Sequence, residues 1–238
     1  MKRIESITLR VKDLDKMTNF YKDVLNMDIL LKNENETVFK NPRLHLVAGA
    51  DTVSYHNYNG LFHLAILLPS LASLGSFIKH LSNQNVGQIG ASDHGFSNAI
   101  YLSDPENNGI EVYADTGINE SYSKPLNVQK LIYMADLSFN KMPDDAFFGH
   151  IHLEVDDIEK GREFYVNKLG LDVMMDWPEA LFVSKDGYHH HVAFNVWNKT
   201  KGHLPDNYTG LISYTIKLEE VETGAYIDPF GIEVVVSE

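Results

Sequence analysis

The sequence predicts an α+β fold assembled from four βαβββ modules, of which the fourth is truncated. Two observations predict this fold: one long repeat relates the two halves of the 238-residue chain, and a second repeat follows the first within each half. A third observation concerns chemistry, because the chain has no cysteine and places histidines and carboxylates in apolar strands. Any bound metal would therefore be held by histidine and carboxylate side chains.

The long repeat occupies residues 7–28 and returns at residues 151–172. Each copy begins with an alternating strand, continues through an Asp that can cap a helix, and reaches a short helix that ends in Phe-Tyr. A turn then leads into a second strand. These copies define the first and third modules, which we place at residues 1–50 and 146–197.

The second repeat relates residues 60–66 to residues 210–216. It continues in an Asp-Pro turn followed by Gly-Ile-Glu-Val, which occurs within residues 104–112 and again within residues 228–234. These copies define the second and fourth modules.

The second module spans residues 58–114 and the fourth spans residues 208–238. The second module has room for an amphipathic helix from Ser70 to Leu81, with its apolar side chains on one face. The fourth module is too short for such a helix, so we expect it to be a degenerate structural partner. The modules form an N-terminal half (1–114) and a C-terminal half (146–238), joined by a linker at residues 115–145.

Composition restricts the partners of the chain. The longest apolar run, residues 64–68, is too short to span a bilayer, and the N-terminus lacks the apolar core of a signal peptide. A net charge of −13 argues against nucleic acid and anionic membranes as partners. We therefore expect a cytoplasmic protein that acts on a small molecule, and exposed module edges are compatible with a homo-oligomer.

Several polar side chains stand where an apolar strand or its edge is expected. They are His63, Tyr101 and Glu111 within strands of the second module, His94 in a loop, His150 at the start of the third module, and the run His189-His190-His191. An imidazole or a carboxylate with apolar neighbours must be paired, hydrogen-bonded or bound to a metal, because burying it alone costs several kcal/mol. These residues are the candidates for a site.

The modular pattern resembles the vicinal oxygen chelate superfamily, and the second module is similar to the iron-binding module of catechol 2,3-dioxygenases. That module runs Leu-His-His-Val, Arg-His-Gly, Ile-Tyr, Asp-Pro and Gly-Asn before a Glu ligand. The matching motifs in this chain are Leu61-Phe62-His63-Leu64, Asp93-His94-Gly95, Ile100-Tyr101, Asp104-Pro105 and Asn108-Gly109-Ile110-Glu111. The resemblance implies paired, open barrel-like mixed sheets.

The resemblance also implies roles for individual residues. His63 and Glu111 stand at the positions of iron ligands, and His150, fifteen residues before the Tyr of the Phe-Tyr pair, stands at that of the third ligand. His94 and Tyr101 match a pair near the substrate oxygens. His190 matches the family's acid–base histidine, and His191 is the alternative if a bulge shifts the strand. Strand alternation would turn His189 and His191 away from His190.

The chain departs from the family in where its ligands lie. The family takes its three ligands from the third and fourth modules, but here Ser213 replaces the histidine of the fourth module, and Ser6 replaces that of the first. Only the second and third modules together supply two histidines and a glutamate. We therefore expect these two modules to form the active sheet and the first and fourth to form an inactive partner, in which His45 is non-catalytic.

Two histidines and a carboxylate on one face of a metal are typical of non-haem Fe(II) oxygenases, and Mn(II) accepts similar ligands. The sequence thus predicts an extradiol dioxygenase that opens a catechol-type ring with O2. One alternative is a glyoxalase-type or fosfomycin-resistance-type enzyme, which would use a similar ligand set. Another alternative is a metal-free drug-binding resistance protein.

Overall fold

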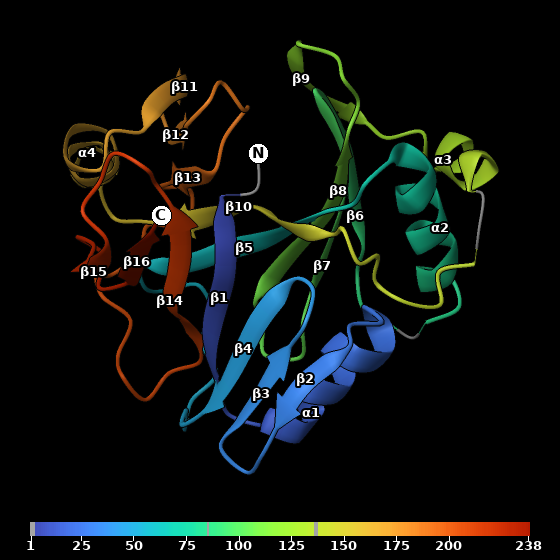
Figure 1. The fold of residues 1–238 in the computed structure, drawn as a ribbon, viewed down its shortest axis with the longest axis horizontal. Helices are drawn as coiled ribbons and strands as arrows, with labels where there is room; N and C mark the ends of the chain where they lie inside the picture. Colours follow the sequence, from blue (N-terminus) through green and yellow to red (C-terminus); the bar gives the residue numbers. More distant parts are fainter. Residues whose placement is uncertain (1–2, 85, 136–137) are drawn as a thin grey trace.

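The computed structural model describes residues 3–84, 86–135 and 138–238, and it has the expected α+β architecture. The described strands form an open 16-stranded mixed sheet (Figure 1). The strand pairing divides this sheet into two wings, which are joined where Ile4 of β1 pairs with Phe148 of β10. The predicted fold class is therefore confirmed.

The first wing combines the first and fourth modules in the strand order β15-β16-β14-β1-β4-β3-β2. Its elements are β1 (Ile4–Val11), α1 (Leu14–Asn19), η1 (Phe20–Val24), β2 (Ile29–Lys32), β3 (Glu36–Phe39), β4 (Arg43–Ala48), β14 (Gly210–Lys217), β15 (Gly224–Ile227) and β16 (Glu233–Ser237). Within the described residues 218–223, between β14 and β15, there is no helix, as the short fourth module predicts.

The second wing combines the second and third modules in the order β9-β6-β7-β8-β5-β10-β13-β12-β11. Its elements are β5 (Gly60–Leu67), α2 (Leu71–Leu81), β6 (Gly90–Gly95), β7 (Ser97–Ser103), β8 (Gly109–Asp115), β9 (Ser121–Pro125), β10 (Phe147–Glu154), α4 (Ile158–Gly161), η2 (Arg162–Lys168), β11 (Asp172–Trp177), β12 (Ala180–Ser184) and β13 (Val192–Asn195). The antiparallel pairing of β5 with β10 joins the two modules that supply the candidate ligands.

Helix α2 shows why the second module folds as its sequence predicts. Ser70 caps the helix, because its hydroxyl accepts a hydrogen bond from the backbone N–H of Ser73. Leu74, Phe77 and Leu81 repeat at helical spacing and are buried against the sheet. The predicted helix is confirmed.

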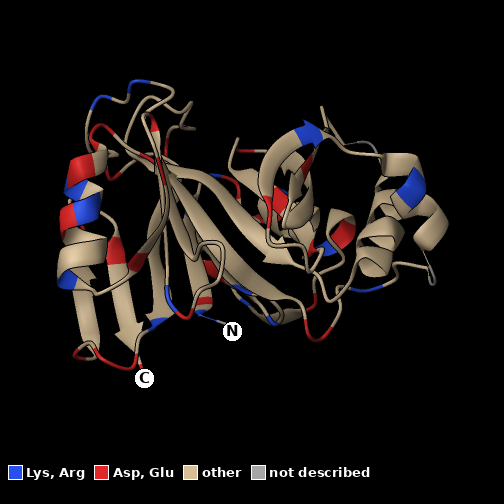
Figure 2. Ribbon diagram, turned by 90° about the horizontal axis from the view of Figure 1, so that it is seen from above, with Lys and Arg blue, Asp and Glu red and all other residues tan. Residues whose placement is uncertain are grey.

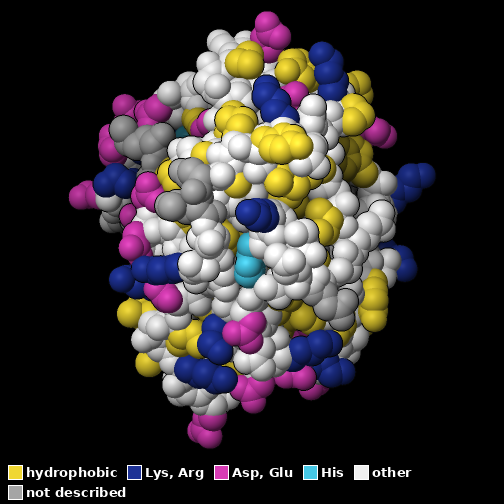
Figure 3. Space-filling model, turned by 90° about the vertical axis from the view of Figure 1, so that its right-hand side faces the viewer, with side chains coloured by type: hydrophobic (Ala, Val, Ile, Leu, Met, Phe, Trp, Pro, Cys, Tyr) yellow, Lys and Arg dark blue, Asp and Glu magenta, His cyan; other side chains and the backbone are white. Residues whose placement is uncertain are grey.

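Residues 115–145 contain more structure than their sequence indicates. β9 pairs with β6 and extends the second wing, and α3 (Val128–Met134) packs on α2. A Cβ at Gly75 would lie 2.0 Å from the carbonyl oxygen of Leu131, so the two helices approach too closely there for any larger residue. Figure 3 faces this side of the molecule and shows apolar side chains gathered on its upper half.

Two buried hydrogen bonds explain why the repeated motifs Phe-Tyr and Asp-Pro occur together. The Tyr21 hydroxyl donates to Asp104 Oδ2 at 2.9 Å, and the Tyr165 hydroxyl donates to Asp228 Oδ2 at 2.7 Å. Each bond crosses between the wings, and the two run in opposite directions, from the first wing to the second and from the second to the first. We name them the tyrosine–aspartate cross-links.

The surface carries charges of both signs. Lys and Arg are interspersed with Asp and Glu along the described chain, and helix α4 with η2 is an example (Figure 2). There, Lys160 pairs with Asp156, and Arg162 pairs with Glu159. None of the described helices combines the length and the apolar character that a bilayer crossing requires.

Candidate metal centre

Three adjacent strands of the second wing bring His63, Glu111 and His150 together. Ala65 of β5 is the register partner of Glu111 on β8 and also of His150 on β10. His63 lies two residues before Ala65 and therefore shares its face of the sheet. The three side chains therefore lie on one face of the sheet, with Ala65 between Glu111 and His150.

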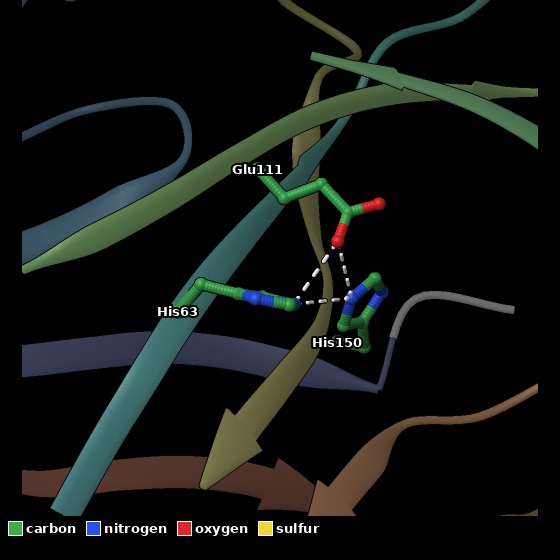
Figure 4. Close-up of side chains that lie close together, drawn as sticks. All are labelled: His63, Glu111 and His150. Atoms are coloured by element: carbon green, nitrogen blue, oxygen red, sulfur yellow. Dashed lines mark hydrogen bonds and ion pairs between the residues drawn. The ribbon is translucent and has the colours of Figure 1, made fainter. Parts of the chain in front are cut away.

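The three side chains converge on one point (Figure 4). His63 Nε2 lies 3.0 Å from Glu111 Oε2, and His150 Nε2 lies 3.2 Å from the same oxygen. The two Nε2 atoms are 3.3 Å apart. Ligand atoms at adjacent positions around a metal, each about 2.1 Å from it, lie about 3.0 Å apart at right angles. The residues present therefore fit a metal ion bound on one face.

The surroundings of His150 and Glu111 keep both side chains in the protonation states that bind a metal. His150 is 1% exposed, and burial lowers its pKa to about 4, although Glu111 opposes this shift. Burial alone would raise the pKa of the Glu111 carboxyl, but His150 and His63 outweigh it and hold that pKa well below its ordinary range. A neutral imidazole and an ionised carboxylate are the forms that coordinate metals.

The three residues form one wall of a cavity of about 590 Å³. Six of the other lining side chains are the apolar or aromatic groups of Phe62, Phe96, Met175, Trp177, Phe182 and Trp197. A mainly apolar cavity with a few polar groups at one end is typical of a small-molecule site. Residues 121–123 of β9 also line it, so the region between the two halves contributes to the cavity.

His94 and Tyr101 lie at the same cavity and bind each other. The Tyr101 hydroxyl and His94 Nε2 are 2.7 Å apart, and Tyr101 is the register partner of Glu111. Burial raises the pKa of the Tyr101 hydroxyl, so it stays protonated. The expectation that His94 lies in a loop is wrong, because Gly90–Gly95 forms β6, which pairs with β7 and β9.

The run of three histidines does not follow strand alternation. β13 begins only at Val192, so residues 189–191 lie before the strand and their side chains are not constrained to alternate. His190 lines the cavity, and its ring centroid lies 4.1 Å from that of His150. Burial is the main cause that lowers the pKa of His190 well below the ordinary value, and the nearby His150 adds to it. The expectation that His189 points away from His190 is wrong, because their Nδ1 atoms are 2.8 Å apart.

His191 does turn away, as expected. Its Nδ1 lies 2.8 Å from Ser184 Oγ and accepts a hydrogen bond from the backbone N–H of Lys185. Of the two candidates for the acid–base role, His190 is the one that lines the cavity.

His152 is a cavity residue that was not expected from the sequence. Its ring also lines the cavity, 4.8 Å from the ring of His63, and Asn195 Nδ2 donates to its Nε2 at 3.1 Å. The signal that could have found it is parity, because residues two apart on a strand share a face. His152 follows His150 by two and should have been considered with it.

Comparison with known proteins places the chain in one family. The model of the Glyoxalase/Bleomycin resistance protein/Dioxygenase superfamily matches residues 3–112. The chain belongs to this superfamily, as its motifs predict. A Catechol-2,3-dioxygenase of Bacillus subtilis (strain 168) is 33% identical over 234 residues, which cover 90% of this chain and 82% of that protein. The relative supports a dioxygenase or a related enzyme.

Solved structures share the fold at low sequence identity. A Bacillus subtilis protein superposes with a TM-score of 0.65 at 11% identity, covering 98% of this chain and 84% of its own. Glyoxalase I from Zea mays superposes with a TM-score of 0.57 at 15% identity, covering 99% and 92%. These similarities show the vicinal oxygen chelate fold.

Proposed function

We propose that this protein is an extradiol dioxygenase that cleaves a catechol-type ring with O2 at a ferrous ion held by His63, Glu111 and His150. The observation that carries the proposal is the convergence of these three side chains on the wall of an aromatic-lined cavity. The Bacillus subtilis relative supports the same reaction class. A bound Fe(II), or Mn(II) with similar ligand preferences, would supply the redox chemistry that joins the ring to O2.

The chain supplies binding and proton transfer. The aromatic wall excludes water and packs against the flat ring of the substrate. Tyr101 and His94 can hydrogen bond a substrate oxygen from the side of Glu111 and fix the orientation of the ring. His190, a neutral imidazole at the cavity wall, accepts a proton from a catechol hydroxyl. The product is a ring-opened hydroxymuconic semialdehyde or a relative of it.

The test is anaerobic reconstitution with Fe(II), followed by aerobic addition of catechol. We expect a yellow product and oxygen uptake, and loss of both in His63→Ala and His150→Ala. His45→Ala is the matched control, because His45 lies on β4 in the other wing and should keep its activity. Iron-loaded protein that consumes no oxygen with a panel of catechols would refute the proposal.

The same variants separate the alternatives. A glyoxalase-type enzyme would convert a hemithioacetal without consuming oxygen, and its activity would also depend on His63 and His150. A metal-free binding protein would bind its ligand equally well after both substitutions. Neither alternative gives the His94–Tyr101 pair a role in catalysis.

A further inference from the structure

A chain of hydrogen bonds leads from the cavity to the surface through His189. His190 Nδ1 lies 2.8 Å from His189 Nδ1, and His189 Nε2 lies 3.3 Å from Asp115 Oδ1. His190 is 6% exposed and lines the cavity, whereas the side chain of Asp115, at the end of β8, is 38% exposed. The chain therefore connects a buried cavity residue with a carboxylate that water reaches.

The chemistry of the three groups determines where the protons lie. An ionised carboxylate can only accept, so His189 must carry its proton on Nε2. With one proton on His189, its Nδ1 atom is then an acceptor, and His190 must donate to it from its own Nδ1. This leaves Nε2 of His190 as an unprotonated nitrogen, and no described residue forms a hydrogen bond with that atom.

The packing around His189 holds this arrangement in place. Phe96 stacks on its ring with centroids 4.4 Å apart and an angle of 23° between the planes. The ring of Tyr188 lies 4.0 Å away at 35°, and its hydroxyl reaches Asp115 at 3.2 Å. Because the rings of Phe96 and Tyr188 pack against the His189 ring and the His189 side chain is only 10% exposed, this ring has little freedom to rotate.

We propose that His189 and Asp115 are positioning residues that fix the tautomer of His190 and form the path by which the substrate proton leaves the cavity. The proposal rests on the proposed function, in which His190 is the base. A catechol hydroxyl gives its proton to His190 Nε2, and the Nδ1 proton of His190 passes to His189 Nδ1. The Nε2 proton of His189 then passes to Asp115. Asp115 then releases its proton to water, so one proton has left the cavity and both imidazoles are again neutral. When His190 later returns a proton from Nε2 to the reacting substrate, Asp115 takes a proton from water, and both tautomers are restored.

The tautomers can be measured without turnover. In 15N NMR spectra of metal-free protein, we expect His189 to be protonated at Nε2 and His190 at Nδ1. In His189→Phe, which keeps an aromatic ring between Phe96 and Tyr188, His190 should lose its preference for the Nδ1–H form. Protonation of His189 at Nδ1, or an unchanged tautomer of His190 in the variant, would overturn the proposal.

Kinetics test the proton path in the iron-loaded enzyme. We expect His189→Phe to lower kcat by about 10- to 100-fold, a loss of the size seen for residues that orient metal ligands, with a much smaller change in KM and the same iron content. Asp115→Asn should lower kcat in the same direction, and both variants should show a larger solvent deuterium isotope effect. His45→Phe is the control and should leave kcat unchanged.

The outcomes distinguish this proposal from the function on which it rests. An unchanged kcat in His189→Phe, or a loss explained by lower iron content, would overturn the proton path while the dioxygenase function stands. If the wild-type protein turns over no catechol, the function fails, and the NMR tautomers alone decide whether His189 fixes the state of His190.

Discussion

The tyrosine–aspartate cross-links should differ in strength, although the two tyrosines occupy equivalent places in the repeat. Tyr21 and Tyr165 each donate to a buried carboxylate, and a hydrogen bond to a charged group contributes about 1.5–3 kcal/mol. The Tyr165 hydroxyl also accepts from the Tyr214 hydroxyl at 2.9 Å, so its removal leaves a second buried group without this partner, at about 1–3 kcal/mol more. We expect Tyr21→Phe to lower the free energy of unfolding by about 2 kcal/mol and Tyr165→Phe by about 3–5 kcal/mol.

Urea denaturation at pH 8 measures both losses, because burial raises the pKa of Asp104 only to about 6 and its carboxyl is ionised there. Tyr133→Phe is the control, since this residue is 82% exposed and its substitution should change the free energy of unfolding by less than about 0.5 kcal/mol. Equal losses for the two cross-links, or a larger loss for Tyr21→Phe, would refute the reasoning.

Three further predictions concern pH, packing and metal binding. Burial raises the pKa of Asp104 to about 6, so the folded protein holds this proton more tightly than the unfolded chain does, and the stability that Asp104 contributes should fall by about 2 kcal/mol between pH 4 and pH 7. The difference in unfolding free energy between the wild type and Asp104→Asn measures this fall, and a constant difference would contradict it. A Cβ at Gly149 would lie 1.8 Å from the Tyr113 hydroxyl, so Gly149→Ala should cost about 1–3 kcal/mol, and adding Tyr113→Phe should recover part of that loss in thermal unfolding. Glu111→Gln should weaken Mn(II) binding in calorimetry by more than about 100-fold, because even residues that only support a ligand cost about 10- to 100-fold; similar affinity would argue against a metal at Glu111.

Much of the fold could be predicted because the chain repeats itself. Local sequence patterns predict the alternating strands, the cap at Ser70 and the short fourth module. The pairing of the second module with the third was also predictable. Ser6 and Ser213 occupy the histidine positions of the first and fourth modules and cannot bind a metal as histidine does, so only the second and third modules supply a complete ligand set. β9 and α3 were not predicted, because each is stabilised by a distant segment, β6 or α2, and not by its own pattern.

The candidate site was predictable where residues lie within regular strands. The resemblance of the second and third modules to the catechol 2,3-dioxygenase motifs singles out His63, Glu111 and His150, and the structure brings them together. The orientation of His189 could not be predicted from strand alternation. Side chains alternate only within a strand, and β13 starts three residues after His189. A histidine in an irregular segment is placed by what surrounds it, here Phe96 and Tyr188, and that packing is not visible in the sequence.

The position of the metal centre has a consequence for how the chain matures. His63 and Glu111 come from the first half of the sequence and His150 from the second, and 87 residues separate the two histidines. A long loop must close before the three ligands meet, so the site is complete only after both halves have docked. An ion bound there would act as a staple between the halves, adding about 2.7 kcal/mol to the stability of the docked state at a concentration one hundred times its dissociation constant. Metal supply would then regulate how long the folded protein survives, in addition to whether it can act.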